Sequence, residues 1–483
     1  MRFKVIQKIL GLLLAVFSIT LLPPLFIAHW TRDGAGDAFA ITIAATLIAG
    51  LALWLPVRHS AKEMRLRDGF VVVVLFWTVL GISGAIPFML VDSLKMAPTE
   101  AIFESMSGLT TTGATVIVGL DYLPPSILFY RQLLQWLGGM GIIVLAVAIL
   151  PMLGVGGMQL YRAETPGPMK DSKLTPRITE TAKALWYIYL SLTVMCASAY
   201  FLAGMSLFDA VSHSFSTVAI GGFSTHDLSI GYFDNARIEL IAVFFMLLSG
   251  INFSLHFLAW RSRTVVHYMR DSEFKMYIFL LGLVCLISTI GLSMTNTSDS
   301  WLSSLRQGLF QSVSIGTTTG FTTTAFQMWP GFLPLLLIFT SFVGGCAGST
   351  GGGIKVIRCL LLYKQGMREI HRLIHPNAIM TIKMGGRPVH SRVVDAVWGF
   401  FATYVAVFGI LLLSLMATGL DQVTAFSAVA ACLNNLGPGL GEVSYHYGEL
   451  TGVAKLILSF AMLLGRLEIF TLFVLFTPAF WRA

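Results

Sequence analysis

Apolar segments of roughly 20 residues, the length that crosses a bilayer as a helix, recur along the whole chain. Only 12% of the 483 residues are charged and 55% are hydrophobic, whereas about a quarter of a soluble domain is charged. No stretch remains for a separate soluble domain, and the first apolar segment lacks the small-residue cleavage site of a removable signal peptide. We predict ten membrane spans, near residues 9–30, 39–57, 70–91, 126–152, 184–204, 237–260, 275–295, 332–362, 393–418 and 452–480.

The net charge of +8 follows the predicted topology and does not indicate a nucleic-acid partner. Basic residues gather in alternate loops, in the segments "RHSAKEMRLR", "YRAETPGPMKDSKLTPR", "RSRTVVHYMRDSEFK" and "KQGMREIHRLIHPNAIMTIKMGGRPVHSR". By the positive-inside rule these loops are cytoplasmic, and so are both chain termini. The opposite face is acidic, which either raises the local cation concentration or merely follows from the topology.

Enzymatic chemistry and tightly bound cofactors find no support in the sequence. The chain has no nucleophile–base grouping, no ATPase motif and no cluster of metal ligands, and nothing indicates an organic cofactor. Its five cysteines are odd in number and show no CxxC spacing, which argues against a disulfide framework or a zinc site. We therefore predict that the protein is not an enzyme.

Four short segments lie between the spans and repeat one another. They are "FESMSGLTTTGAT", "SHSFSTVAIGGFS", "FQSVSIGTTTGFT" and "SAVAACLNNLGPG", and they align on Gly113, Gly222, Gly320 and Gly437. The fourth copy has drifted, since alanine and valine replace the aligned serines of the others. Each copy follows one span and precedes another, so the repeating unit is a span, a short helix, a polar strand and a second span.

Polar backbone at membrane depth is tolerated only where it is buried in protein or lines a water-filled cavity. Four such strands can share one axis, and a short helix whose C-terminus points at that axis favours a cation there. Carbonyl oxygens can then replace the hydration shell of the ion. No carboxylate lies in any of the four strands, so a monovalent cation fits better than Ca²⁺ or Mg²⁺. The alternative is four ordinary re-entrant turns or helix-packing patches.

The motifs "TTTGAT", "AIGGFST", "TTTGFTT", "NNLGPGLG", "GGCAGSTGGGIKVIR" and "GRLEIFTLFVLF" resemble those of the Trk/Ktr/HKT superfamily of potassium transporters. The resemblance covers the whole chain and implies an all-α polytopic membrane protein with a pseudo-fourfold pore. Two N-terminal helices would precede four repeats, each made of a helix, a pore helix, a filter strand and a helix. The corresponding boundaries are 1–68 for the N-terminal spans, then 69–157, 158–270, 271–375 and 376–483 for the repeats.

The resemblance also implies which residues bind K⁺, the transported ion. Backbone carbonyls of the four strands would form the filter, at Thr111, Thr112, Gly113, Ile220, Gly221, Gly222, Thr318, Thr319, Gly320, Asn435, Leu436 and Gly437. Each strand has one aligned glycine where potassium channels carry the longer TVGYG sequence. We therefore expect fewer ordered carbonyl rings and weaker discrimination between K⁺ and Na⁺.

A glycine-rich stretch interrupts the span near 332–362. In the superfamily the corresponding segment is an intramembrane gate loop below the filter, which would here comprise Gly344, Gly345, Cys346, Ala347, Gly348, Ser349, Thr350, Gly351, Gly352 and Gly353. A nucleotide-binding loop is rejected, because the Walker pattern needs Gly-Lys-Ser/Thr between a strand and a helix. A plain glycine packing face remains an alternative.

Arg466 lies deep in the last predicted span, where a charge is costly and by default indicates a function. The resemblance places it below the filter, where it would hinder cations or contact the gate loop. The alternative is an ion pair with a nearby carboxylate, although Glu468, only two residues on, would face elsewhere on an ideal helix.

These features predict K⁺ uptake across the bacterial inner membrane through a gated, carbonyl-lined filter. The resemblance implies a homodimer that works with a cytoplasmic, nucleotide-binding regulatory subunit of the TrkA type, in contact with membrane lipid. A proton- or sodium-coupled cation symporter is an alternative. Less favoured are a solute symporter, whose inverted repeats these same-topology repeats do not match, and a membrane scaffold.

Overall fold

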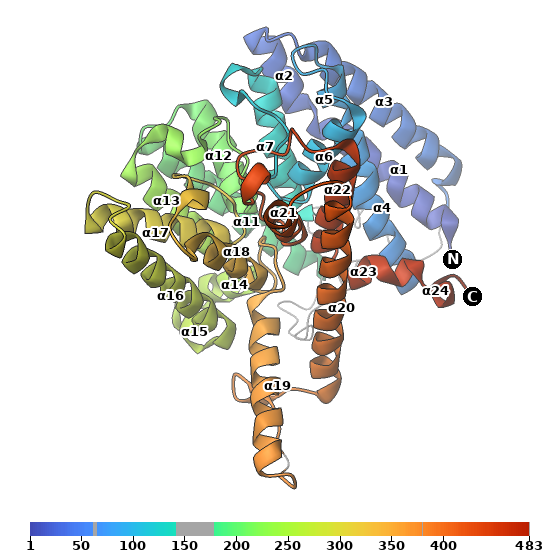
Figure 1. The fold of residues 1–483 in the computed structure, drawn as a ribbon. Helices are drawn as coiled ribbons and strands as arrows, with labels where there is room; N and C mark the ends of the chain where they lie inside the picture. Colours follow the sequence, from blue (N-terminus) through green and yellow to red (C-terminus); the bar gives the residue numbers. More distant parts are fainter. Residues whose placement is uncertain (61–64, 142–177, 379, 483) are drawn as a thin grey trace.

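The structure is a computed structural model that describes residues 1–60, 65–141, 178–378 and 380–482. Over these residues the chain is mostly helical, with one small antiparallel hairpin of β1 (Lys383–Met384) and β2 (Arg387–Pro388). The two termini lie side by side (Figure 1). Arg482 O accepts a hydrogen bond of 3.1 Å from Arg67, and the backbone N–H of Arg2 donates to Asp68, so both termini lie against the start of the third span.

Six segments of the described chain are long and apolar enough to cross a membrane. They are α1 (Phe3–Thr20) with α2 (Leu22–Thr31), α3 (Gly36–Trp54) with the 3₁₀ turn η1 (Leu55–Val57), α4 (Leu66–Gly84) with α5 (Ile86–Leu90), α11 (Ile178–Leu202), α16 (Ser272–Met294) and α20 (Ser391–Met416). α1 and α3 pack closely because Gly11 and Gly50 face each other, and a Cβ on either would lie under 3 Å from the other's carbonyl oxygen.

Two predicted spans are not straight helices. The segment 237–260 consists of α13 (Ala236–Ser249) and α14 (Phe253–Ser262), which meet at 92°. The segment 452–480 divides into α22 (Gly452–Arg466) and a second helical segment, Phe470–Phe476, at 103°. Asn252 caps the start of α14 through its side-chain oxygen, and the left-handed residues Glu468 and Ile469 end α22. Each of these two predicted spans is therefore a bent pair of helices, a feature that hydropathy does not reveal because it reports composition and not direction.

Two further predicted spans are only partly described or are interrupted. For 126–152 the structure gives α7 (Pro125–Gly139), and residues 142–177, including the predicted boundary at 157, lie outside the described residues. The segment 332–362 contains α18 (Leu333–Val343), a non-helical stretch and the start of α19 (Val356–Ile374), which projects below the rest of the molecule (Figure 1). The count of ten spans therefore stays a prediction.

Four short helices precede the four polar segments predicted as strands, which are non-helical and form no β-sheet, and for which the name strand is kept. They are α6 (Pro98–Leu109), α12 (Leu207–Ala219), α17 (Trp301–Gly316) and α21 (Gln422–Leu433). Proline at the first position begins α6, whereas Ser206, Ser300 and Asp421 cap the other three by accepting backbone N–H bonds.

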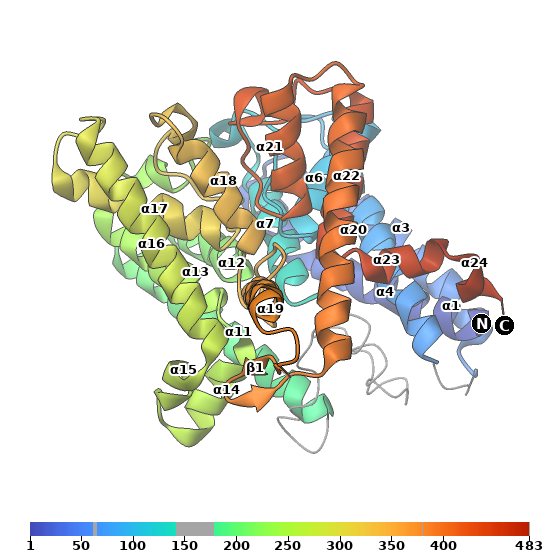
Figure 2. The same cartoon turned by 60° about the horizontal axis from the view of Figure 1, so that its bottom comes forward.

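The short helices pack in a cyclic order. α12 contacts α7, α17 contacts α13, α21 contacts α18, and α6 closes the circle by contacting α22 (Figure 2). Each short helix thus packs against the helix that follows the strand of the preceding repeat. This order brings the four strands together although about a hundred residues separate one from the next.

The remaining elements are short. They are α15 (Val266–Arg270), α23 (Phe470–Phe473), α24 (Pro478–Trp481) and the 3₁₀ turns η2 (Leu120–Tyr122), η3 (Ser229–Phe233), η4 (Phe326–Met328), η5 (Gly441–Val443) and η6 (Val474–Phe476).

Candidate functional site

The four short helices end in the same backbone turn. Beyond each helix an N–H donates to a carbonyl five residues earlier, in the pairs Thr112–Ser107, Gly221–Ser216, Thr319–Ser314 (each 2.8 Å) and Leu436–Ala431 (2.7 Å). The preceding residue is left-handed in every copy, with φ of 57° at Thr111, 54° at Ile220, 69° at Thr318 and 54° at Asn435. Residues that carry a side chain rarely adopt this backbone conformation. Its recurrence at all four positions, including the drifted fourth copy, shows that the repeats share one backbone geometry.

The aligned glycines close a ring. They are left-handed as well, with φ of 81° at Gly113, 79° at Gly222, 84° at Gly320 and 99° at Gly437. A Cβ on the first three would lie 2.1 Å from a carbonyl oxygen of the next strand, at Gly221, Thr319 and Leu436 respectively, and one on Gly437 would lie 2.6 Å from Thr112 O. Each glycine therefore touches the following strand, and the fourth strand returns to the first. Both the conformation and the space require glycine.

The ring offers neutral oxygen atoms to an ion. All four glycines line one open pocket, together with polar residues such as Ser224, Thr322 and Tyr445. The C-termini of the four short helices lead into the ring, which makes it favourable for positive charge. No group of three or more His, Cys, Asp or Glu side chains within the described residues could hold a metal ion. The chemistry of the ring therefore suits a monovalent cation bound by carbonyl and hydroxyl oxygens.

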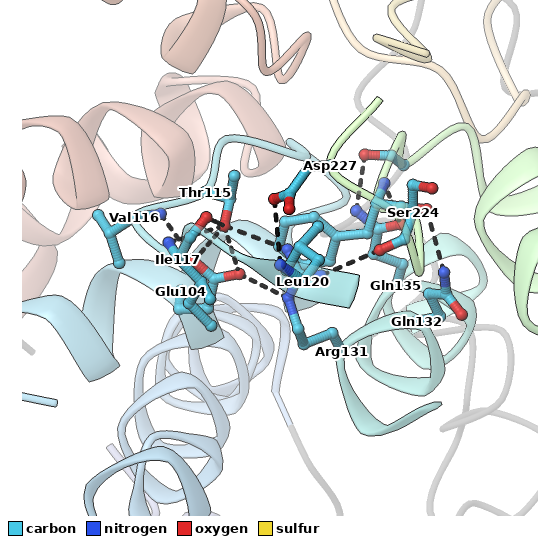
Figure 3. A network of polar contacts seen from close by, with 12 residues as sticks. Glu104, Thr115, Val116, Ile117, Leu120, Arg131, Gln132, Gln135, Ser224 and Asp227 are labelled. Atoms are coloured by element: carbon cyan, nitrogen blue, oxygen red, sulfur yellow. Dashed lines mark hydrogen bonds and ion pairs between the residues drawn. The ribbon is translucent and has the colours of Figure 1, made fainter. Parts of the chain in front are cut away.

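A buried ion pair ties the first strand to the second (Figure 3). Arg131 Nε lies 2.8 Å from Glu104 Oε1, and both side chains are almost completely buried. The Glu104 carboxylate accepts hydrogen bonds from Thr115 Oγ1 at 3.0 Å and from the N–H of Val116 at 2.9 Å. Arg131 also donates to Ser224 O at 3.1 Å. The charges are satisfied by each other and by the backbone that they hold in place.

The glycine-rich stretch 344–353 lies directly against the inner ends of the strands and short helices. The N–H of Gly353 donates to Asn434 O at 3.1 Å, and the N–H of Gly352 donates to Thr318 Oγ1 at 2.7 Å. Thr350 Oγ1 donates to Val218 O at 3.0 Å. A Cβ on Gly352 would lie 1.9 Å from Asn434 O, so the close approach itself excludes a side chain.

Contacts on the inner side anchor the same stretch to neighbouring helices. Glu273, at the start of α16, accepts hydrogen bonds from the N–H groups of Ala347 at 2.7 Å and Ile357 at 3.1 Å. The N–H of Phe253, the first residue of α14, donates to Gly348 O at 3.0 Å. The stretch is therefore joined to the second, third and fourth repeats.

Arg466 lies between the first strand and the glycine-rich stretch. Its Nη1 is 3.2 Å from Thr111 Oγ1 and 3.2 Å from Thr350 O, and its Nη2 donates to Gly138 O at 2.5 Å. The carboxylate of Glu468, the alternative partner considered from the sequence, forms an ion pair with Arg358. Arg466 thus contacts the first strand, the glycine-rich stretch and the end of α7 at once.

The outer mouth carries a titratable cluster. His226 Nδ1 lies 2.5 Å from Asp121, and His226 Nε2 lies 3.5 Å from Asp209. Burial alone would lower the pKa of His226, but the two carboxylates raise it above its usual value. Burial would raise the pKa of Asp209, yet the nearby His226 and hydrogen bonds from Ser206 and Thr225 hold that pKa well below its usual range.

Several residues of this site were not predicted from the sequence. Glu104, Arg131, Gln135 and Glu273 were not singled out, although all four bind backbone of the strands or of the glycine-rich stretch. A signal was present for two of them, because Arg131 and Gln135 lie four residues apart in an apolar segment and so share a helix face.

Comparison with known proteins decides the family. Residues 35–483 match the TrkH family, described as cation transport protein. The chain belongs to the TrkH family. Curated TrkH proteins named "Trk system potassium uptake protein TrkH" are 60% identical in Vibrio parahaemolyticus and in Halomonas elongata and 57% identical in Escherichia coli, in each case over 100% of both chains. The structure also matches the crystal structure of the potassium transporter TrkH from Vibrio parahaemolyticus, with a TM-score of 0.90 and 57% identity over 100% of both chains.

Membership of the TrkH family confirms the superfamily resemblance noted from the sequence motifs. Because the family consists of cation transporters, the chain is not an enzyme, as predicted. With its several apolar helices it is a multi-pass membrane protein.

Proposed function

We propose that this protein takes up K⁺ through a carbonyl-lined filter formed by the four strands around a pseudo-fourfold pore. The observation that carries the proposal is the closed ring of left-handed glycines, each packed against a carbonyl of the next strand. Carbonyls held in a ring can replace the hydration shell of K⁺ without a buried charge. The relatives that match over their full length carry potassium uptake in their names, which agrees with this ion.

The glycine-rich stretch 344–353 acts as the gate of this pore. It bonds to Asn434 O and Thr318 Oγ1, at the inner ends of the fourth and third repeats, and therefore lies across the route of an ion leaving the filter. Arg466 adds a positive charge beside it. Opening requires the stretch to release these hydrogen bonds and move aside.

A cytoplasmic regulatory subunit of the TrkA type supplies the signal for opening. α19 begins next to the gate and projects beyond the rest of the molecule (Figure 1). The part of α19 farthest from the gate exposes Tyr363, Ile370 and Leu373 among basic residues. Such a surface is suited to a protein partner. We place both termini in the cytoplasm of a bacterium, the protein in its inner membrane, and two copies in a homodimer.

Uptake of ⁸⁶Rb⁺ into liposomes that contain the purified protein tests the function. We expect K⁺ to suppress this uptake much better than Na⁺ does. An imposed pH gradient separates a pore from the alternative, a proton-coupled symporter, because only the symporter is driven by the gradient. Equal suppression by K⁺ and Na⁺ in a protein with a shortened gate stretch, in which the gate is not limiting, would contradict the filter.

A further inference from the structure

The second strand alone carries a glycine directly before its aligned glycine. Gly221 stands where the other strands carry Thr112, Thr319 and Leu436. Its φ lies outside the left-handed region, so its backbone conformation accepts a side chain. The surrounding space does not accept one without a shift of its neighbour, because a Cβ on Gly221 would lie 2.4 Å from both Cδ and Oε1 of Gln135. The neighbouring side chain therefore accounts for this glycine.

Gln135 uses that space to bind the strand on both sides of its aligned glycine. Its Nε2 donates to Gly221 O at 2.6 Å, and its Oε1 accepts from the N–H of Phe223 at 3.1 Å. The side chain is completely buried and comes from α7, in the first repeat (Figure 3). One carboxamide thus fixes the orientation of the two peptide groups that flank Gly222.

Two other side chains of α7 bind the next carbonyl groups of the second strand. Gln132 Nε2 donates to Phe223 O at 3.3 Å, and Arg131 Nη1 donates to Ser224 O at 3.1 Å. The carbonyl that Gln135 binds is also the one that lies against Gly113 in the ring. A change at Gln135 therefore acts directly on the contact between the first and second strands.

We propose that Gln135 is a positioning residue that sets the preference for K⁺ over Na⁺ by fixing the carbonyl of Gly221, a role that rests on the proposed filter. A carbonyl whose oxygen accepts a hydrogen bond from Gln135 resists turning inward around a smaller ion. Discrimination between ions depends on how many carbonyls they meet and on how freely those carbonyls move. Without the donor, the second strand adapts to Na⁺ and holds K⁺ less well.

The test uses bacterial cells that lack their own K⁺ uptake systems but keep the cytoplasmic regulatory subunit. In Gln135→Met, which has nearly the same length but no hydrogen-bonding groups, we expect the KM for K⁺ to rise about two- to tenfold, the factor that one ordinary hydrogen bond is worth. Na⁺ should compete better by a similar factor, with Vmax and protein amount within about twofold of wild type. A merely structural role would lower protein amount and Vmax and leave the competition unchanged.

Gln311→Met is the matched control. Gln311 is an equally buried glutamine, and no hydrogen bond to its carboxamide exists within the described residues. We expect its competition profile to equal that of wild type. Unchanged KM and competition in Gln135→Met would overturn the proposal while leaving the filter intact, whereas wild-type uptake that K⁺ and Na⁺ suppress equally would overturn the filter and this role with it.

A second design does not depend on how well Gln135→Met folds. Gly221→Thr alone should impair K⁺ uptake, because its Cβ would lie 2.4 Å from the Gln135 carboxamide and displace it from Gly221 O and the N–H of Phe223. The double variant Gln135→Ala/Gly221→Thr rebuilds the threonine found in the first and third strands and provides room for it, so we expect it to recover transport but to keep the weaker K⁺ preference caused by loss of the Gln135 donor. A double variant as inactive as Gly221→Thr would contradict the proposed contact.

Discussion

Arg466 donates a hydrogen bond from Nη1 to the backbone carbonyl of Thr350, 3.2 Å away, and so joins the last apolar segment to the glycine-rich stretch. The same nitrogen lies 3.2 Å from Thr111 Oγ1, at the inner end of the first strand. One guanidinium therefore holds the stretch against the ring and places a positive charge between them.

Arg466→Gln should raise ⁸⁶Rb⁺ uptake into liposomes by at least about tenfold. Two unit charges 4 Å apart at an effective dielectric constant of 20 interact by about 4 kcal/mol, so even a largely screened charge opposes a cation strongly. Arg466→Lys tests the positive charge separately from the contact geometry, because lysine keeps the charge but loses the forked hydrogen bonds of the guanidinium. Uptake by Arg466→Gln at the wild-type level would argue against a role in closing the pore.

Gly352→Ala should make uptake independent of the regulatory subunit. Its Cβ would meet Asn434 O at 1.9 Å, so the stretch must move away from the inner end of the fourth repeat. Gly409→Ala, on α20, makes the same chemical change where nothing lies within 4 Å, and it should behave as wild type. Deleting residues from 344–353 should act in the same direction as Gly352→Ala, and regulated uptake in both variants would refute the gate.

Gly113→Ser should reduce K⁺ uptake at least tenfold without loss of the folded protein. The substitution strains a left-handed residue, by roughly 1–2 kcal/mol, and drives a side chain against Gly221 O. Gly119→Ser carries the same strain at φ 78° but has open space, with the nearest atom 3.9 Å away. Equal uptake by the two variants would show that the ring contact is unimportant to transport.

The repeats and the glycine positions were predictable because each leaves a local trace in the sequence. Gly113 and its three counterparts are needed for a backbone conformation that few other residues adopt, so they survive even where the fourth copy has drifted. The glycine-rich stretch was equally visible as a break in an apolar run.

The bends between helices and the polar side chains that bind the strands leave weaker signals in the sequence. The bend after Ser249 depends on the cap at Asn252 and keeps the composition apolar, so a hydropathy window reads through it. Gln135 and Gly221 are 86 residues apart, and their relation follows only from the packing of α7 against α12. One sequence shows that each residue is unusual in its segment but does not show that the two are partners.

Glu104→Ala should destabilise the folded protein by about 3–5 kcal/mol, the cost of leaving a buried partner charge uncompensated. The measurement is the midpoint of thermal unfolding in detergent. Replacing both partners, in Glu104→Met/Arg131→Met, should cost less than the single variant because no buried charge remains. A single variant as stable as wild type would mean that water reaches Arg131.

The outer cluster should make stability depend on pH through His226. Its pKa in the folded protein is raised above the usual 6.5 by Asp209 and Asp121, against the effect of burial. The bound proton therefore stabilises the fold fully below about pH 6.5, and this contribution is lost as the pH rises through the raised pKa. The ring centroid of His213 lies 6.5 Å from that of His226, so His213 is a further titratable group that faces His226. We expect the unfolding temperature of wild type to fall from about pH 6 to pH 8, and that of His226→Asn to change less over the same window. Parallel curves for the two proteins would contradict a charged His226 at this mouth.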